Sequence, residues 1–285
     1  MKKNLLKIAS LALAATAIVG FAACGETGKN VKVLKEIELT AEEYAFAIKK
    51  GNTDLMTSVN GLLTEMESDG SLDALINSYF DGTATFTHEN KTSTPEADDF
   101  VVATNACFPP FEYYEGNKVK GVDIELAYKI ATELGQDLFV MDMAFDSIIP
   151  SVMNATDGVD IGMAGMTVTA DRQTQVDFAN GYYESAQVIT VLEEDTTFDS
   201  CTTAAQVEEI LKTKDKNYKV GTQNGTTGYM YTAGDEDFGY DGFTNLTTNG
   251  YTTGALAMKD LSNGKINAVI LDKQPAIMIA ATINK

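Results

Sequence analysis

A run of small and hydroxyl-bearing residues that ends in an arginine is the part of this chain best suited to chemistry. Residues 164–172 have the sequence AGMTVTADR and follow a short apolar segment that predicts a strand. Gly165 would let the backbone approach a ligand closely, and Thr167 offers a hydroxyl. Thr169 could cap a helix beginning just after it, which would place Arg172 in the first turn. That guanidinium could hold a carboxylate through two parallel hydrogen bonds, although the spacing alone favours a surface salt bridge.

The composition argues against several other classes of function. The formal net charge of −20 disfavours nucleic acids and anionic membranes, because both require basic surfaces. The single histidine, His88, lies in a polar stretch that predicts solvent exposure, so neither a histidine-dependent triad nor a transition-metal site is expected. Besides Cys24 there are only Cys107 and Cys201, too few for a disulfide framework or a zinc site, although one bridge between them is possible. No cofactor is expected.

The first residues predict export and anchoring to a membrane. Lysines precede an apolar run over residues 8–21, which is too short to span a bilayer comfortably. Two alanines and then Cys24 follow, and this pattern resembles the lipobox of bacterial lipoproteins, in which the cysteine is lipidated. Phe21 stands where the lipobox usually has leucine. We therefore predict a signal peptide over residues 1–23 and a lipid anchor on Cys24, with an ordinary cleaved signal peptide as the alternative.

The elements that must position these residues change in character along the chain. Thr40 and Glu43 fit a helical capping box, although residues 44–48 could equally form a strand. Residues 55–80 carry apolar side chains at helical spacing and predict two helices, and residues 82–98 predict a polar linker. Beyond it, short buried strands alternate with helices, which is typical of an α/β fold with mainly parallel sheets. The expected strands cover residues 100–104, 138–141, 160–163, 188–192, 219–222 and 268–271, with a helix over residues 123–134.

Six short motifs give the chain a resemblance to a known family. They are FPPFEY at residues 108–113, GVDIEL at 121–126, FDSIIP at 145–150, the run over 162–172, VDF at 176–178 with YY at 182–183, and NAVILD at 267–272. Each is weak alone, but together they follow the family's order and spacing. The region over 98–285 resembles the solute-binding proteins of polar amino-acid ABC transporters, of the family 3 type. The resemblance implies a type II periplasmic-binding-protein clamshell whose two α/β lobes, each with a mixed, mainly parallel sheet flanked by helices, close by hinge motion.

The resemblance also implies roles for individual residues in binding a free L-amino acid. Arg172 would bind the ligand carboxylate and Asp272 the ligand ammonium. The Thr167 hydroxyl would assist at the ammonium, and Thr167 would also help at the carboxylate. Further contacts would come from the Ala164 carbonyl and from the backbone at Thr226 or Thr227. Taken alone, Asp272 could equally cap the helix that follows it.

Aromatic and amide side chains would shape the rest of this site. By the same resemblance Phe108 and Phe145 would enclose the ligand, although either ring could simply belong to the core. Asn105 and Gln223 stand where relatives vary with the side chain of the ligand; alone, they are typical of a turn and of a loop. Because neither amide offers a full charge, we expect a ligand with a polar, uncharged side chain.

Two other functions are weighed against binding. A dehydratase-type enzyme that shares this fold would need a general acid or base beside the ligand carboxylate, and Glu112 or Lys273 would have to serve without an evident partner. An extracellular sensor would be expected to carry a second membrane segment or a cytoplasmic domain, and none follows Lys285. We therefore predict a monomeric binding protein, not an enzyme, which delivers its amino acid to an ABC permease from the outer face of the bacterial cell membrane.

The order of the segments predicts a circular permutation. Residues 31–82 resemble the end of the family's sequence, which would normally follow the position of Lys285, and residues 82–98 would join the family's usual ends. The alternative is an unrelated helical appendage on a shortened protein. Exposed termini that lie close together make such a rearrangement tolerable. The expected division is a tether over 24–30, a first lobe over 42–82 and 98–183, a linker over 83–97, and a second lobe over 31–41 and 184–285.

Overall fold

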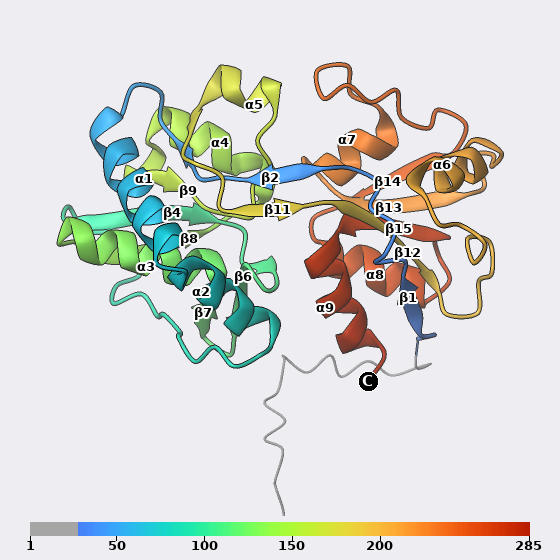
Figure 1. Cartoon of the computed structure of the whole chain (residues 1–285), viewed down its shortest axis with the longest axis horizontal. Coiled ribbons are helices and arrows are strands. Elements are labelled where there is room, and N and C mark those ends of the chain that lie inside the picture. Colours follow the sequence, from blue (N-terminus) through green and yellow to red (C-terminus); the bar gives the residue numbers. More distant parts are fainter. Residues whose placement is uncertain (1–27) are drawn as a thin grey trace, which may run out of the picture.

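The computed structural model describes residues 28–285, so the predicted signal peptide and the lipidation site Cys24 lie outside the described residues. Two α/β lobes lie side by side and are joined by extended strands that pass between them (Figure 1). Across the described part of the chain, no helix has the length and apolar character that crossing a membrane requires. The two-lobed α/β fold expected from the sequence is confirmed.

The first lobe contains a five-stranded sheet with helices on both faces. In spatial order its strands are β10 (Asp177–Phe178), β3 (Ala47–Ile48), β9 (Ile161–Gly162), β4 (Asp99–Thr104) and β8 (Asp137–Asp142). Side chains of β4 alternate between two cores, as the pleat of a strand requires. Phe100 and Val102 share a core with α1 (Thr53–Ser68), α2 (Ser71–Phe80) and α3 (Val122–Leu134), whereas Val101 and Ala103 share one with α4 (Phe145–Asn154).

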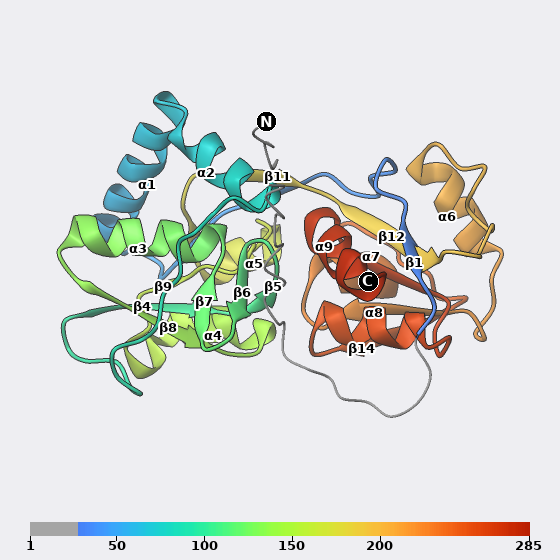
Figure 2. The ribbon, with the colours of Figure 1, turned by 90° about the horizontal axis from the view of Figure 1, so that it is seen from below.

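The second lobe repeats this plan with a second five-stranded sheet (Figure 2). Its strands, in spatial order, are β1 (Val31–Val33), β12 (Gln187–Leu192), β15 (Ala268–Asp272), β13 (Lys219–Gln223) and β14 (Thr247–Tyr251). Ile270 of β15 packs with α6 (Ala204–Lys212) and α7 (Thr227–Ala233) on one face. Val269 and Leu271 pack with α8 (Gly254–Ser262) and α9 (Lys273–Ile283) on the other.

Shorter elements complete the described chain. A small sheet is formed by β5 (Cys107–Phe108), β6 (Glu112–Glu115) and β7 (Lys118–Lys120), a 3-10 turn covers Thr156–Gly158, and α5 spans Ala170–Gln175. In each large sheet two neighbouring strand pairs are parallel and two are antiparallel. The sheets are therefore mixed, as expected, with a larger antiparallel share than expected. Three of these four antiparallel pairs involve β1 or β3, which come from the N-terminal segment, and the fourth joins β12 to β15.

Two antiparallel strands form the connection between the lobes. In β2 (Glu42–Tyr44) and β11 (Tyr183–Ser185), Tyr44 lies opposite Tyr183 and Glu42 opposite Ser185 (Figure 1). Of the two alternatives for this segment, the strand forms and the capping box does not. Because side chains alternate along a strand, Glu42 and Tyr44 turn into the protein while Glu43 stays exposed. The crossing strand thus delivers two polar groups to the space between the lobes.

The segment between α2 and β4 is held against the first lobe along much of its length. The backbone of His88 exchanges two 2.8 Å hydrogen bonds with Val119. The Asn90 amide bonds both the N–H and the carbonyl of Val140, each at 2.8 Å. Both contacts cap strands at a sheet edge, which limits pairing with other chains. The expected exposure of His88 is wrong, because its ring is half-buried, and burial lowers its pKa.

Candidate ligand-binding site

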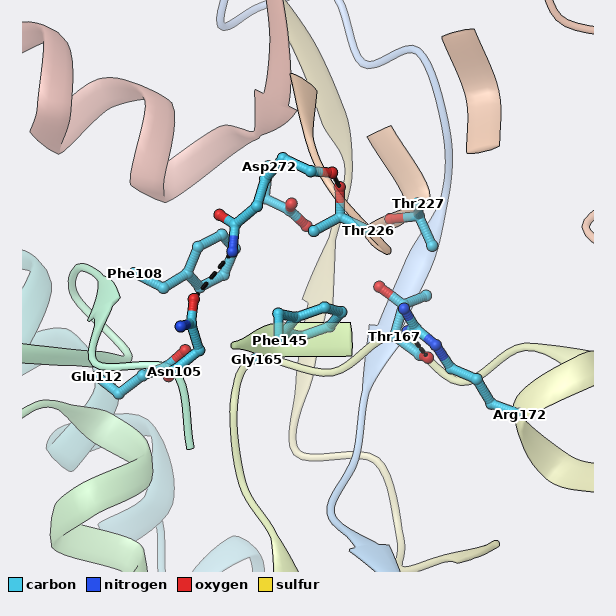
Figure 3. Close-up of a pocket in the computed structure, with 11 residues that line it drawn as sticks. Asn105, Phe108, Glu112, Phe145, Gly165, Thr167, Arg172, Thr226, Thr227 and Asp272 are labelled. Carbon is cyan, nitrogen blue, oxygen red and sulfur yellow. Dashed lines mark hydrogen bonds between the residues drawn. The ribbon is translucent and has the colours of Figure 1, made fainter. Parts of the chain in front are cut away.

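A small cavity with a free volume of about 10 Å³ lies between the two lobes (Figure 3). That is about the space of one water molecule, so the lobes are closed around the site. It is lined by Asn105, Phe108, Glu112, Phe145, Gly165, Thr167, Arg172, Gln223, Thr226, Thr227 and Asp272. These include every binding residue expected from the sequence except Ala164, whose side chain is buried in the core beside Gly165. Glu112 is the one addition.

Arg172, the only arginine in the sequence, is fixed at the start of α5. Thr169 caps this helix as predicted, its hydroxyl accepting the backbone N–H of Arg172 at 3.2 Å. The guanidinium is 4% exposed and lies 5.3 Å from the centre of the Phe145 ring. It donates to the carbonyl of Thr167 at 2.6 Å and, across the cleft, to that of Gly225 at 2.9 Å. Arg172 is therefore a pocket residue and not a member of a surface salt bridge.

The charge of Arg172 remains available for an anion. Among residues 28–285 no carboxylate lies within salt-bridge distance of it. Two of its five N–H groups are used on backbone carbonyls, which leaves donors for a ligand. Burial lowers the pKa of Arg172 to about 10, and the nearby carboxyl groups of Glu42 and Asp272 limit this lowering. The guanidinium therefore stays charged at neutral pH.

Asp272 comes from the second lobe, at the end of β15. Its side chain is buried and makes no capping hydrogen bond to α9, so the capping alternative does not apply. Instead it accepts a short hydrogen bond from the Tyr44 hydroxyl on the crossing strand. Burial, together with the nearby charge of Glu42, raises the pKa of Asp272 to about 7. A buried carboxyl with a raised pKa is stabilised in its ionised form when a cation binds beside it, and the proton is then released.

Glu42 is a buried carboxylate that the sequence interpretation missed. Its side chain lies directly behind the pocket wall and accepts hydrogen bonds from the hydroxyls of Thr167 and Thr227, each at 2.7 Å. These partners are 125 and 185 positions away in the sequence, and no local pattern joins them. The only sequence signal was the alternation around Tyr44, which was compatible with a helix as well as a strand.

The two amides expected to recognise the ligand's side chain bond to each other. The Gln223 amide donates to the Asn105 carbonyl oxygen at 2.9 Å, joining the second lobe to the first (Figure 3). Asn105 also donates to the carbonyl of Met143 at 2.7 Å, and Gln223 accepts the N–H of Gly254 at 3.1 Å. Both amides lie in the pocket lining, but part of their hydrogen-bonding capacity is used within the protein.

Glu112 is the polar group of the pocket with no partner. Its side chain is 0% exposed, and within the described residues neither carboxylate oxygen has a hydrogen-bond partner. Burial, with a contribution from Asp123, raises the pKa of Glu112 well above its ordinary value. An unpaired buried carboxyl is costly, and a cationic ligand group would satisfy it.

Gly165 is required where it stands. Its φ is +51°, and a Cβ atom there would lie 2.8 Å from the Cε1 atom of Phe108. Its N–H donates to the buried carboxylate of Asp123 at 2.8 Å, which fixes the loop that precedes Thr167. Phe108 lines the pocket and also belongs to the core of the first lobe.

An enclosed acidic pocket between two α/β lobes that are joined by crossing strands defines a clamshell-type binding protein. The chain belongs to the bacterial extracellular solute-binding proteins, family 3, whose model matches residues 100–273. That match covers every lining residue of the pocket and the strands of both large sheets apart from β1 and β3, and it omits the segment that carries β1, β2, β3, α1 and α2.

Known relatives of the chain are named as amino-acid-binding proteins. The putative ABC transporter arginine-binding protein 2 of Escherichia coli (strain K12) is 32% identical over 181 residues, which is 63% of this chain and 65% of that protein. A probable histidine-binding protein of Neisseria gonorrhoeae is 30% identical, with 61% and 58% covered. Holo ArgBP from T. maritima is similar in structure, with 29% identity, a TM-score of 0.52, and 65% of this chain and 74% of that chain covered. The chain thus spans slightly less than two thirds of these curated relatives.

Proposed function

We propose that this protein captures a free L-amino acid with a cationic side chain, such as arginine, and presents it to an ABC importer without chemical conversion. The observation that carries the proposal is the set of charges around one small cavity. Arg172 offers a guanidinium for the ligand carboxylate, Asp272 a carboxylate for the ammonium, and Glu112 an unpaired carboxyl for a third charge. A zwitterion with one extra positive charge matches that set.

The balance of charge favours a cationic side chain over a neutral one. Three carboxyl groups, Glu42, Glu112 and Asp272, lie around the cavity, with Arg172 as the cationic side chain. A cationic ligand side chain would favour the ionised form of Glu112 and pair with it, whereas a neutral one would leave this buried carboxyl unpaired. The earlier expectation of an uncharged side chain is revised for this reason, since Asn105 and Gln223 use their amides on each other. The arginine- and histidine-binding names of the relatives support the same ligand class.

An enzymatic role has weaker support. Lys273 pairs with Glu38 at 2.7 Å and does not line the cavity. Glu112 lines it, but within residues 28–285 its carboxyl has no hydrogen-bond partner to relay a proton. The relatives, moreover, are named for binding.

A ligand panel tests this function directly. We expect L-arginine at 100 times its Kd to stabilise the purified protein by about 2.7 kcal/mol, which is a rise in melting temperature of roughly 5 to 10 °C. L-Citrulline is the matched control, because it replaces the guanidinium with a neutral group of similar shape. We expect citrulline to bind at least about tenfold more weakly, as a lost charge-assisted hydrogen bond predicts. If none of the twenty amino acids shifted the melting temperature, the proposed function would be wrong.

We further propose that the protein is held to the outer face of the cell membrane by a lipid on Cys24. The apolar run over residues 8–21 and the small residues before Cys24 support this anchor. The described chain begins beside β1, so the tether would enter the second lobe. A tether of this kind would keep the pocket near a permease while leaving both lobes free to move.

We also propose that the chain is a circular permutant of its family. The segment over 31–82 contributes β1 to the second sheet, β2 to the crossing and β3 to the first sheet, and its helices complete the first core. The family match begins only at residue 100, after this segment. The Asn284 side chain bonds both the N–H and the carbonyl of Val31, at 2.9 and 2.8 Å, so the proposed new ends lie together. On this proposal the lobes divide at residues 41/42 and 183/184.

Reordering the chain tests the permutation. A variant that runs from residue 98 to 285, continues through a short Gly/Ser linker, and ends with residues 30–82 should fold alike and bind within about threefold of the original affinity. Limited proteolysis within residues 83–97 should leave the two fragments of the original chain associated, because β3 lies inside the first sheet. Release of residues 31–82 from a stable core over 98–285 would contradict the permutation.

A further inference from the structure

We propose that Glu42 acts as a positioning residue that sets the hydrogen-bond polarity of the pocket hydroxyls, so that they accept from the ligand ammonium and do not donate to its carboxylate. The inference deepens the proposed function and rests on it. Glu42 lies outside the cavity lining and touches the ligand only through Thr167 and Thr227.

The geometry around Glu42 makes its carboxylate an acceptor on every side. One oxygen, Oε2, accepts from Thr167 and Thr227 at 2.7 Å each and from the Gln187 amide at 3.4 Å. The other, Oε1, accepts from the Thr40 hydroxyl at 2.7 Å. The side chain is 8% exposed, so water competes little with these four donors. A neutral group would not suit a site in which all four neighbours donate.

This arrangement determines which way each threonine hydroxyl points. A hydroxyl has one hydrogen and two lone pairs, whereas a carboxylate can only accept. The hydrogens of Thr167 and Thr227 are therefore directed at Glu42, and only lone pairs remain toward the cavity. Thr227 also accepts from the Gln187 amide at 3.1 Å, which leaves Thr167 with the greater free capacity. Lone pairs attract an ammonium and repel a carboxylate.

As a consequence, different parts of the pocket bind the ammonium and the carboxylate of the ligand. The Thr167 hydroxyl joins Asp272 as an acceptor for the ammonium, and the ligand carboxylate is left to Arg172 and backbone N–H groups. Glutamine at position 42 removes the negative charge and replaces one accepting oxygen with an N–H donor, so a threonine hydroxyl that faces the amide nitrogen must accept and is free to turn its hydrogen into the cavity. The change keeps the size of the side chain, so it tests polarity more than packing.

Two ligands that differ only at the α-amino group separate this role from a structural one. We would titrate L-arginine and 5-guanidinopentanoate, which lacks the ammonium, into the original protein and into Glu42→Gln by calorimetry, with competition for weak binding. Glu42→Gln should weaken L-arginine by about 10- to 100-fold and change 5-guanidinopentanoate less than about threefold, as expected for lost hydrogen bonds to a charged group. Glu43→Gln, the same change on the exposed neighbour in β2, should alter neither affinity.

The remaining outcomes decide against the proposal. Equal weakening of both ligands would assign Glu42 a merely structural role, and no weakening of either would show that it does not position the hydroxyls. If Glu42→Gln does not fold, Thr167→Val removes the acceptor itself and must show the same selective loss; equal loss there overturns the proposal. Failure of the original protein to bind L-arginine would overturn the proposed function as well, and this is distinguishable because no variant is involved.

Discussion

Replacing Arg172 with alanine is expected to weaken L-arginine binding by about 30- to 5,000-fold, because truncating a buried charge partner typically costs 2–5 kcal/mol. The guanidinium is buried, has no ion-pair partner in the described chain and bridges the lobes through Thr167 and Gly225. Its loss removes the planar donor for the ligand carboxylate and leaves that carboxylate facing an acidic pocket. Isothermal titration calorimetry of the purified variant measures the change.

A conservative substitution separates the geometry of Arg172 from its charge. Arg172→Lys keeps the positive charge but not the two parallel donors, so its affinity should fall between those of the original protein and of the alanine variant. Far-ultraviolet circular dichroism and the melting temperature of each variant show whether the fold is kept. Unchanged affinity in folded Arg172→Ala would remove the proposed carboxylate clamp.

Replacing Asp272 with asparagine is expected to weaken L-arginine by about 30-fold or more while leaving the free protein equally stable or more stable. The affinity falls because the ammonium loses a buried counter-charge worth about 2 kcal/mol or more. Stability is kept because asparagine removes a buried charge that repels Glu42 and still accepts the hydrogen bond of Tyr44. Calorimetry and thermal unfolding of the same variant measure the two effects.

The pH dependence of ligand binding tests whether Asp272 binds the ligand ammonium. Its folded pKa of about 7 lies above that of an ordinary carboxyl, so the empty pocket takes up a proton as the pH falls through 7. A cationic ligand must displace that proton, and its affinity should fall by up to about tenfold per pH unit below pH 7. The unliganded protein should instead gain stability from Asp272 as the pH falls from about 7 toward 4. In Asp272→Asn the pH dependence should be weaker, with a remainder from Glu112; an identical dependence would discredit the assignment.

Several alternatives that the sequence left open were decided by long-range contacts. Spacing could not place Arg172 in a pocket, since an arginine in a helical first turn is compatible with a surface ion pair. The stronger signal was the amino-acid composition of the chain, because Arg172 is the only arginine among its 21 lysine and arginine residues. For Asp272, the position after a strand fitted a helix cap, and only the arrival of Tyr44 from the crossing strand shows its actual partner.

The expected class of ligand side chain shows the limit of interpreting residues one at a time. Asn105 and Gln223 suggested an uncharged side chain because each was considered by itself. In the folded protein they bond to each other across 118 positions of sequence, and among the described pocket residues the unpaired group is Glu112, which the sequence marked only as part of FPPFEY and as a possible acid or base of an enzyme. Which polar group remains unpaired is a property of the whole packing, because it depends on every neighbour.

Local pattern by itself determined the α/β class and many of the helices and strands, while the two lobes and most of the pocket lining were implied by the resemblance of short motifs to a known family. These follow from short-range causes: alternating apolar residues in strands, helical spacing, the Thr169 cap and motifs in family order. The tertiary structure alone decided the hydrogen bonds of Glu42, the pairing of Asn105 with Gln223 and, within residues 28–285, the lack of a partner for Glu112. Those contacts join β2, β13, α7 and the loops that follow β4 and β9, which lie far apart in the chain, and nothing in a local pattern records which of them will meet.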